Sequence, residues 1–188
     1  MEMKNLKSCI LIYVMLTAIT GAAYPLTVTI VSRFLFPDKS EGSLIRINDE
    51  IRGSRLIGQK FNSPAYFWPR PSASDYGTMP SAASNLGPTS ADLMKAVEDR
   101  KKQLSPFISD PIPADMLLAS GSGLDPHISP EAAFSQIDHV VKARGFSSRQ
   151  REELVSLVKR HIEKPQWGIF GSPRVNVLEL NIALDSMR

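Results

Sequence analysis

The sequence predicts an α+β protein in which a single N-terminal transmembrane helix precedes one compact domain with a β-hairpin and about three to four helices. Three observations support this fold class. The stretch Ser8–Ser32 contains no charged residue, later apolar residues recur at helical spacing, and two short apolar runs flank Asn48-Asp49. As a helix the uncharged stretch would be about 37 Å long, which exceeds the roughly 30 Å hydrocarbon core of a bilayer.

A cleaved signal peptide is a second interpretation of the apolar stretch. Lys4 and Lys7 would form its basic region, Cys9–Thr20 its apolar core and Gly21–Ala23 its small-residue cleavage site. The apolar run continues to Val31, which a spanning helix needs and a cleaved signal does not. A buried core helix is a third interpretation, and it fits poorly because the run is long and uncharged. We therefore expect a membrane anchor.

The middle of the anchor contains a proline and several small residues. Pro25 lacks a backbone N–H, so we expect a mild kink near residues 19–21. Two pairs of small residues, each four positions apart, share neighbouring helix faces: Thr17 with Gly21, and Ala18 with Ala22. Small residues let helices approach closely in lipid, so these four are candidate helix-packing residues. The alternative is that they only face lipid.

Charges beside the anchor predict its orientation. Lys4 and Lys7 precede the anchor and Arg33 and Lys39 follow it, so the two sides are nearly balanced. A very short basic tail usually stays in the cytoplasm. We therefore predict three regions: a cytoplasmic tail at residues 1–7, a transmembrane helix at residues 8–32 and an extracytoplasmic soluble domain at residues 33–188.

Overall charge and cysteine content exclude several classes of function. The chain carries 22 Lys and Arg against 19 Asp and Glu, and the two signs are interspersed. No basic block alternates with aromatic residues, so we expect no nucleic-acid partner. Cys9 is the only cysteine and lies in the anchor, which excludes an intrachain disulfide and a cysteine metal site.

A β-hairpin is predicted directly after the anchor. Apolar runs at residues 43–47 and 50–57 flank Asn48-Asp49, which suits a tight turn. Gly53 in the second run indicates a bulge or a close approach of other atoms to the backbone.

Residues 61–88 show no regular periodicity. An unpatterned segment of this length is usually functional or disordered, and its aromatic residues argue against disorder. We therefore predict an ordered loop that contacts a partner through four candidate residues: Tyr66, Phe67, Trp68 and Arg70.

Three helices and a mixed tail are predicted after the loop. The helices cover residues 89–105, 129–145 and 147–164, because each begins at a capping Ser or Thr and ends at Gly or Pro. Apolar residues recur every three or four positions in each of them. The tail is predicted as a short strand up to Val175, followed by a helix that Asn176 caps.

Residues 119–130, with the sequence ASGSGLDPHISP, are the best candidate for chemistry. A hydrolase would use Ser120 or Ser122 as nucleophile and His127 as base. The glycines of a nucleophile elbow are absent around Ser122. The alternative is a glycine-rich turn leading into a capped helix, in which Asp125 bonds its own local backbone.

The remaining histidines and glycines indicate no ligand site. His127, His139 and His161 match no metal-ligand spacing, and no Walker-type phosphate loop occurs. His139 and His161 lie on predicted helices, where we expect them to be solvated or hydrogen-bonded. We therefore predict no catalytic, cofactor-binding or metal-binding residue.

A collinear series of motifs follows the anchor. They are GSLI at 42–45, GSRLIGQKF at 53–61, YF at 66–67, RPSA at 70–73, SNLGP at 84–88, ASGSGLDPHISP at 119–130, Gln136, ARG at 143–145 and PRVNVLELNIAL at 173–184. In this order they resemble the KdpC family, the C subunits of the bacterial potassium-transporting Kdp P-type ATPase. His139 departs from the arginine that this family often has.

The resemblance implies an accessory, noncatalytic subunit of a pump that takes up potassium at high affinity and is driven by ATP. It implies the channel-like subunit KdpA, the catalytic subunit KdpB, the small subunit KdpF and the lipid bilayer of the bacterial plasma (inner) membrane as partners. The complex would handle ATP and potassium, and the family is described as a catalytic chaperone that raises the ATP affinity of the catalytic subunit. The alternative function is an exported hydrolase-like enzyme with a cleaved signal peptide.

Overall fold

The computed structural model describes residues 2–187, with side chains described from residue 5 onward. Met1 and the side chain of Lys4, both in the predicted cytoplasmic tail, therefore lie outside the described part. The chain divides into two compact units. Unit 1 ends at Arg52, and unit 2 begins at Gly53.

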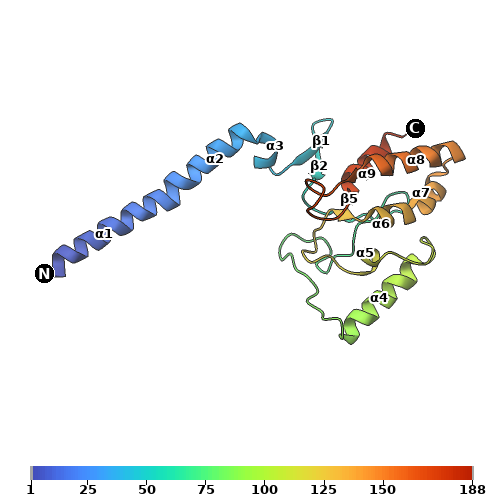
Figure 1. Ribbon diagram of the computed structural model, residues 1–188, viewed down its shortest axis with the longest axis horizontal. Coiled ribbons are helices and arrows are strands. Elements are labelled where there is room, and N and C mark those ends of the chain that lie inside the picture. The colour runs from blue at the N-terminus through green and yellow to red at the C-terminus, as the bar shows by residue number, and fades with distance from the viewer. Residues whose placement is uncertain (1, 188) are drawn as a thin grey trace. The chain divides into compact units, whose positions relative to one another are not determined.

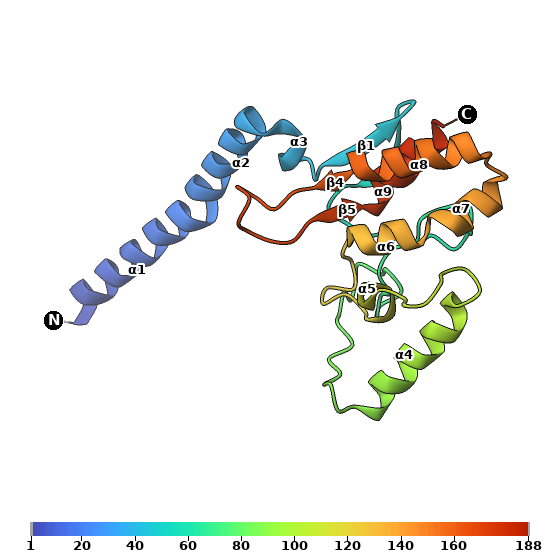
Figure 2. The same cartoon turned by 45° about the vertical axis from the view of Figure 1, so that its right-hand side comes forward.

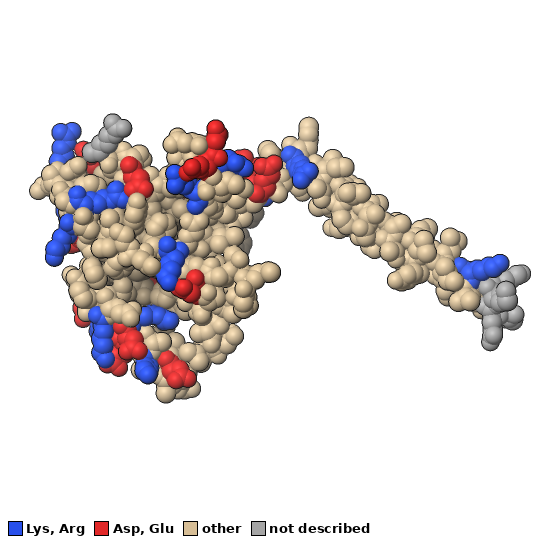
Figure 3. Space-filling model, turned by 180° about the vertical axis from the view of Figure 1, so that it is seen from behind, with Lys and Arg blue, Asp and Glu red and all other residues tan. Residues whose placement is uncertain are grey.

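Unit 1 begins with a long helical stretch in three parts, drawn in blue in Figure 1: α1 (Glu2–Ala18), the π-helical η1 (Ile19–Ala23) and α2 (Tyr24–Leu35). Within it, residues 5–35 are long and apolar enough to cross a membrane by length and composition. Figure 3 shows basic side chains near the two ends of this stretch and none along its middle. The apolar stretch at residues 5–35 extends three residues beyond each end of the anchor predicted at residues 8–32.

The long helix is irregular where the sequence predicts a kink. The Tyr24 N–H donates to the Ile19 carbonyl, five residues earlier, as in a π-helix. Pro25 explains this turn, because its ring would clash with the carbonyl four residues earlier and it has no N–H to donate. Four threonine hydroxyls donate to backbone carbonyls four residues earlier, at 2.7–2.8 Å, so each hydroxyl has a hydrogen-bond partner within the helix. They belong to Thr17, Thr20, Thr27 and Thr29.

The predicted hairpin follows the long helix. After α3 (Pro37–Ser40) the chain forms β1 (Leu44–Ile47) and β2 (Glu50–Ser54), which pair with each other. Asn48 and Asp49 both adopt left-handed φ values, 51° and 63°. A tight type I′ turn requires two successive left-handed residues, and Asn and Asp tolerate this conformation. The hairpin and its turn are therefore confirmed.

Gly53 lies at a point of close packing, as the sequence predicts. A Cβ atom at this position would lie 2.0 Å from Gln59 Nε2 and 2.9 Å from Leu178 Cδ2. Any larger residue would therefore displace the Gln59 side chain and press against Leu178.

Unit 2 combines helices with a small sheet, which Figures 1 and 2 show from two directions. Its helices are α4 (Ala91–Leu104), α5 (Ala114–Leu117), α6 (Pro130–Ser135), α7 (Ile137–Arg144), α8 (Ser148–Arg160) and α9 (Val177–Asp185). Its strands are β3 (His127–Ile128), β4 (Ile162–Glu163) and β5 (Arg174–Asn176). They form one antiparallel sheet in the order β3-β5-β4, in which Val175 pairs with Ile128 on one side and Ile162 on the other.

Three of the predicted helices are confirmed, as α4, α8 and α9, but α8 ends at Arg160 and not at residue 164, because residues 162–163 form β4. The single helix predicted over residues 129–145 is corrected, because it breaks at Gln136 into α6 and α7. Of the three strands in the sheet of unit 2, the sequence predicts only β5, since β3 and β4 are too short to show an apolar alternation. Side-chain caps begin four of these helices: Ser90, Ser129, Ser147 and Asn176.

The core of unit 2 lies between its last four helices and the sheet. Helix α8 packs against α6, α7 and α9, while α6 and α9 contact β5 (Figure 2). Leu154, Val158, Val175, Leu180 and Leu184 have no exposed surface. The apolar stripe predicted for α8 therefore faces the core.

Residues 61–88 contain turns but no helix or strand, and side chains from other elements hold residues 65–68 in place. The Phe67 N–H donates to Asn181 Oδ1, and Asn181 Nδ2 donates to the Phe67 carbonyl, both at 2.9 Å. The Trp68 N–H donates to Gln136 Oε1 at 2.7 Å, and Gln136 Nε2 donates to the Trp68 carbonyl at 3.1 Å. Two buried amides thus pair with consecutive main-chain residues, as a neighbouring strand would.

Replacing Asn181 by alanine should lower the free energy of unfolding by about 2–5 kcal/mol, because a buried N–H and a buried carbonyl would each lose a partner. Denaturant unfolding of the full-length chain in detergent, followed by circular dichroism, measures this change. Asn62→Ala, at an exposed position in the same loop, is the matched control and should have little effect. Equal losses in the two variants would contradict the role of the Asn181 amide.

Candidate functional site

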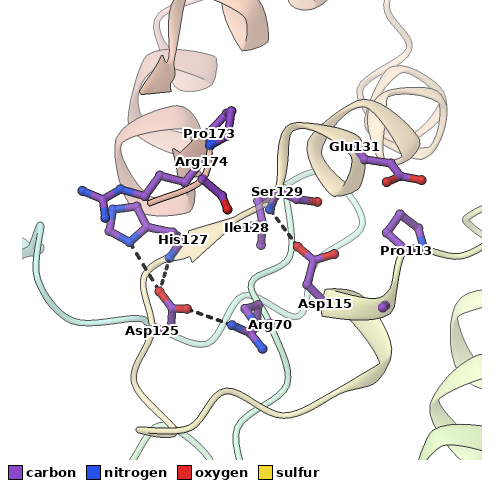
Figure 4. A pocket seen from close by; sticks show the side chains of 12 residues that line it. Arg70, Pro113, Asp115, Asp125, His127, Ile128, Ser129, Glu131, Pro173 and Arg174 are labelled. Carbon is purple, nitrogen blue, oxygen red and sulfur yellow. Dashed lines mark hydrogen bonds and ion pairs between the residues drawn. The ribbon is translucent and has the colours of Figure 1, made fainter. Parts of the chain in front are cut away.

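A pocket of about 500 Å³ lies beside β3 and the first turn of α6 in unit 2 (Figure 4). Segments far apart in the sequence form its wall, from the loop at Arg70 to the start of β5. Six lining side chains can carry charge: Arg70, Asp115, Asp125, His127, Glu131 and Arg174. Because both signs line the same space, the pocket does not select strongly for an anion or a cation.

Arg70, Asp125 and His127 form a chain of polar contacts on the pocket wall (Figure 4). Arg70 Nη1 lies 3.1 Å from Asp125 Oδ2. Asp125 Oδ1 accepts from the His127 backbone N–H at 3.0 Å and lies 3.3 Å from His127 Nδ1. Arg70 and Asp125 are 55 residues apart in the sequence, so the contact joins the predicted partner loop to the glycine-rich turn.

The pKa of Asp125 lies below its usual range. Burial of the carboxyl would raise this pKa, but hydrogen bonds from His127 and the charge and hydrogen bond of Arg70 favour the ionised form and outweigh burial. Asp125 is therefore a carboxylate at neutral pH. It stabilises the Arg70 side chain and closes the local turn at the same time.

The serines of the glycine-rich turn are not arranged as nucleophiles. Ser122 Oγ accepts from the Leu124 N–H at 3.1 Å, within its own turn. Ser120 is buried, and its backbone N–H donates to the Pro71 carbonyl at 3.0 Å. In the part of the chain that the structure describes, no serine hydroxyl is hydrogen-bonded to His127. The local-turn interpretation of Asp125 is therefore confirmed, and the hydrolase interpretation lacks its nucleophile–base contact.

Metal binding finds no support in the arrangement of side chains. Among the described residues, no group of three or more His, Cys, Asp or Glu side chains is placed to hold a metal ion. Asp115, which lines the pocket, accepts instead from the Ser129 N–H at 2.7 Å. That bond ties α5 to the start of α6.

The structure corrects the prediction that Phe67 contacts a partner. Its side chain has no exposed surface and lies in the core of unit 2. Aromatic residues beside prolines in an unpatterned loop indicated a contact surface, but the bonds between Asn181 and the Phe67 main chain turn this side chain inward. The Phe67 side chain is therefore not available at the surface of unit 2.

The other three residues of the predicted contact loop keep some exposed surface. Tyr66 Oη donates to Asp185 Oδ2 at 3.2 Å, and the Trp68 Nε1–H donates to the Ser63 carbonyl at 3.0 Å. Arg70 faces the pocket. Contact of these three residues with a partner stays a prediction.

His139 is buried and hydrogen-bonded, which is one of the two environments that the sequence predicts for it. Its ring stacks on Trp68 with 4.5 Å between ring centres, and its Nε2 lies 3.3 Å from the Tyr66 carbonyl. Its Nδ1 is buried without a partner in the described part of the chain. Burial lowers the pKa of His139, although the Tyr66 carbonyl opposes this shift.

The candidate helix-packing residues lie at the junction of α1 and η1. Thr17 and Ala18 end α1, and Gly21 and Ala22 belong to the π-helical segment. A Cβ atom at Gly21 would meet nothing within 4 Å, so this surface is open to another helix. Its use for packing stays a prediction.

Acid should destabilise unit 2 through His139. The unfolded histidine takes up a proton near pH 6.5 and the folded one resists it, so the stability contributed by neutral His139 is present above this pH and lost below it. His139→Phe should show a shallower fall in the free energy of unfolding between pH 7 and pH 5 than the wild-type protein. Identical slopes in the two proteins would contradict this assignment.

Comparison with known proteins places the whole chain in one family. The family model described as KdpC: K+-transporting ATPase, c chain, matches residues 6–186. A relative from Geobacter metallireducens is 49% identical over 191 residues, which cover 98% of this chain and 99% of the relative. One from Dechloromonas aromatica is 47% identical over 188 residues, or 97% of each chain, and both relatives are named potassium-transporting ATPase KdpC subunits. The chain therefore belongs to the KdpC family of K+-transporting ATPase c chains.

Proposed function

We propose that the chain is an accessory subunit, without chemistry of its own, of an ATP-driven potassium uptake complex. The observation that carries this proposal is the family match over residues 6–186, together with relatives that are named potassium-transporting ATPase KdpC subunits. The apolar helix at residues 5–35 supports a place in the membrane. The missing contact between a serine and His127 supports a role other than hydrolysis.

The proposed topology is a single membrane span with the N-terminus in the cytoplasm and unit 2 outside, in a bacterial plasma membrane. Lys7, directly before the uncharged stretch, supports this orientation. The proposed partners are the channel-like subunit KdpA, the catalytic subunit KdpB and the small subunit KdpF, which the family resemblance implies.

In this topology an effect on ATP affinity must pass through the membrane. ATP is cytoplasmic, the chain has no Walker-type loop, and the pocket of unit 2 mixes three carboxylates with two guanidinium groups. We therefore propose that the chain binds neither ATP nor a metal and instead favours one conformation of its partners. Unit 2 would cap the outer entrance of the potassium pathway and contact the channel-like subunit through Tyr66, Trp68 and Arg70.

The small residues of the anchor provide the first test of assembly. Replacing both Ala18 and Gly21 by leucine should reduce co-purification of the large subunits in mild detergent, because the added side chains would separate closely packed helices. Ile30→Leu, an apolar exchange elsewhere on the same helix, is the control and should co-purify normally. Normal recovery with the double variant would argue against packing through this face.

The topology can be tested with the single cysteine of the chain. In a Cys9→Ser background, Ser81→Cys places one thiol at an exposed position of unit 2. A membrane-impermeant maleimide should label it in intact spheroplasts, and labelling only after lysis would reverse the orientation.

The mass of the intact protein tests whether the anchor is retained. This mass should include the residues before Tyr24, whereas a mature chain that begins at Tyr24 would favour the exported enzyme.

A further inference from the structure

The segment between β4 and β5 carries a cluster of exposed apolar side chains. Residues 165–173, here called the β4–β5 tip, contain no charged residue. Trp167, Ile169 and Phe170 within it are 89%, 78% and 61% exposed. Exposed clusters of this kind on a folded domain mark interaction sites rather than chance exposure.

Hydrogen bonds hold the β4–β5 tip in a defined shape. Gln166 and Phe170 form an isolated antiparallel bridge, in which each backbone N–H donates to the carbonyl of the other at 2.9 and 3.0 Å. Trp167 and Gly168 turn the chain with φ values of 52° and 77°. The Trp167 and Phe170 rings meet edge to face at 5.9 Å. The apolar side chains are therefore presented together on a short, ordered hairpin.

The chemistry of the tip suits the interface between lipid and water. Trp and Phe are large apolar groups, and the indole N–H lets Trp lie where one end is apolar and the other hydrated. Lys164 and Arg174 flank the tip, where cations can meet lipid phosphates. Arg174 also pairs with Glu163 at 2.9 Å, which fixes the base of the hairpin.

The small size of the tip favours lipid over a protein partner. Its three apolar side chains present roughly 500 Å², given about 150–250 Å² per aromatic side chain, whereas a stable protein interface needs about 800 Å² from each partner. The chain also carries its own candidate membrane span.

We propose that the β4–β5 tip inserts Trp167, Ile169 and Phe170 into the headgroup region of the bilayer that the anchor crosses. This second attachment would limit the rotation of unit 2 about the anchor. It requires residues 5–35 to span the membrane, but it does not depend on which side unit 2 occupies. It is therefore separable from the proposed orientation and from the proposed partners.

Trp68 and Trp167 are the two tryptophans of the chain, so removing one of them separates the tryptophan fluorescence of the β4–β5 tip from that of Trp68. The full-length chain is reconstituted into liposomes with lipids brominated on the acyl chains, and its emission is compared with that of Trp167→Phe. The difference between the two proteins reports Trp167, and it should be quenched by the brominated lipids and protected from iodide in the water. Extraction with alkaline carbonate confirms in the same sample that the anchor is inserted, and a chain released by carbonate would overturn the proposal.

A second pair of variants tests the neighbouring side chains. Replacing both Ile169 and Phe170 by serine should remove most of the quenching of Trp167 by brominated lipids, while Met79→Ser, 90% exposed elsewhere in unit 2, should leave it unchanged. Strong iodide quenching of Trp167 without lipid quenching would place the tip in water and overturn the proposal. Protection from iodide that appears only when the large subunits are added, again without lipid quenching, would identify a protein partner instead.

Discussion

Four side chains from the C-terminal half of the chain hold the main chain of residues 65–68. Asn181 and Gln136 each bond both the N–H and the carbonyl of one residue, while Arg144 Nε donates to the Ala65 carbonyl at 2.8 Å. His139 Nε2 lies 3.3 Å from the Tyr66 carbonyl. A segment without a strand partner would otherwise bury unpaired polar groups, which costs about 1–3 kcal/mol for each group. The order of the loop, the burial of Phe67 and the position of Arg70 all depend on these bonds.

Arg70 in turn connects this loop to the pocket of unit 2. Arg70 binds one carboxylate oxygen of Asp125, and the His127 backbone N–H donates to the other. Arg70, Asp125 and His127 therefore stabilise the junction of the two loops.

Local signals in the sequence predicted the elements that depend on local bonds. The sequence alone predicts the Asn48-Asp49 turn and the caps at Ser147 and Asn176, because the hydrogen bonds of each join residues only a few positions apart. The bonds of Gln136 and Asn181 join residues 68 and 114 positions apart, so no local pattern reveals them. For the same reason the sequence predicted Phe67 as a surface residue, although its side chain lies in the core.

The central claim is that this chain supports potassium transport without chemistry of its own. The most direct test replaces Ser122 by alanine and His127 by glutamine together, in the complex with the other subunits, and leaves the Arg70–Asp125 pair in place. Potassium-stimulated ATP hydrolysis is then measured on the purified complex. The account predicts an intact complex that hydrolyses ATP at the wild-type rate. An intact complex that has lost this activity would contradict it.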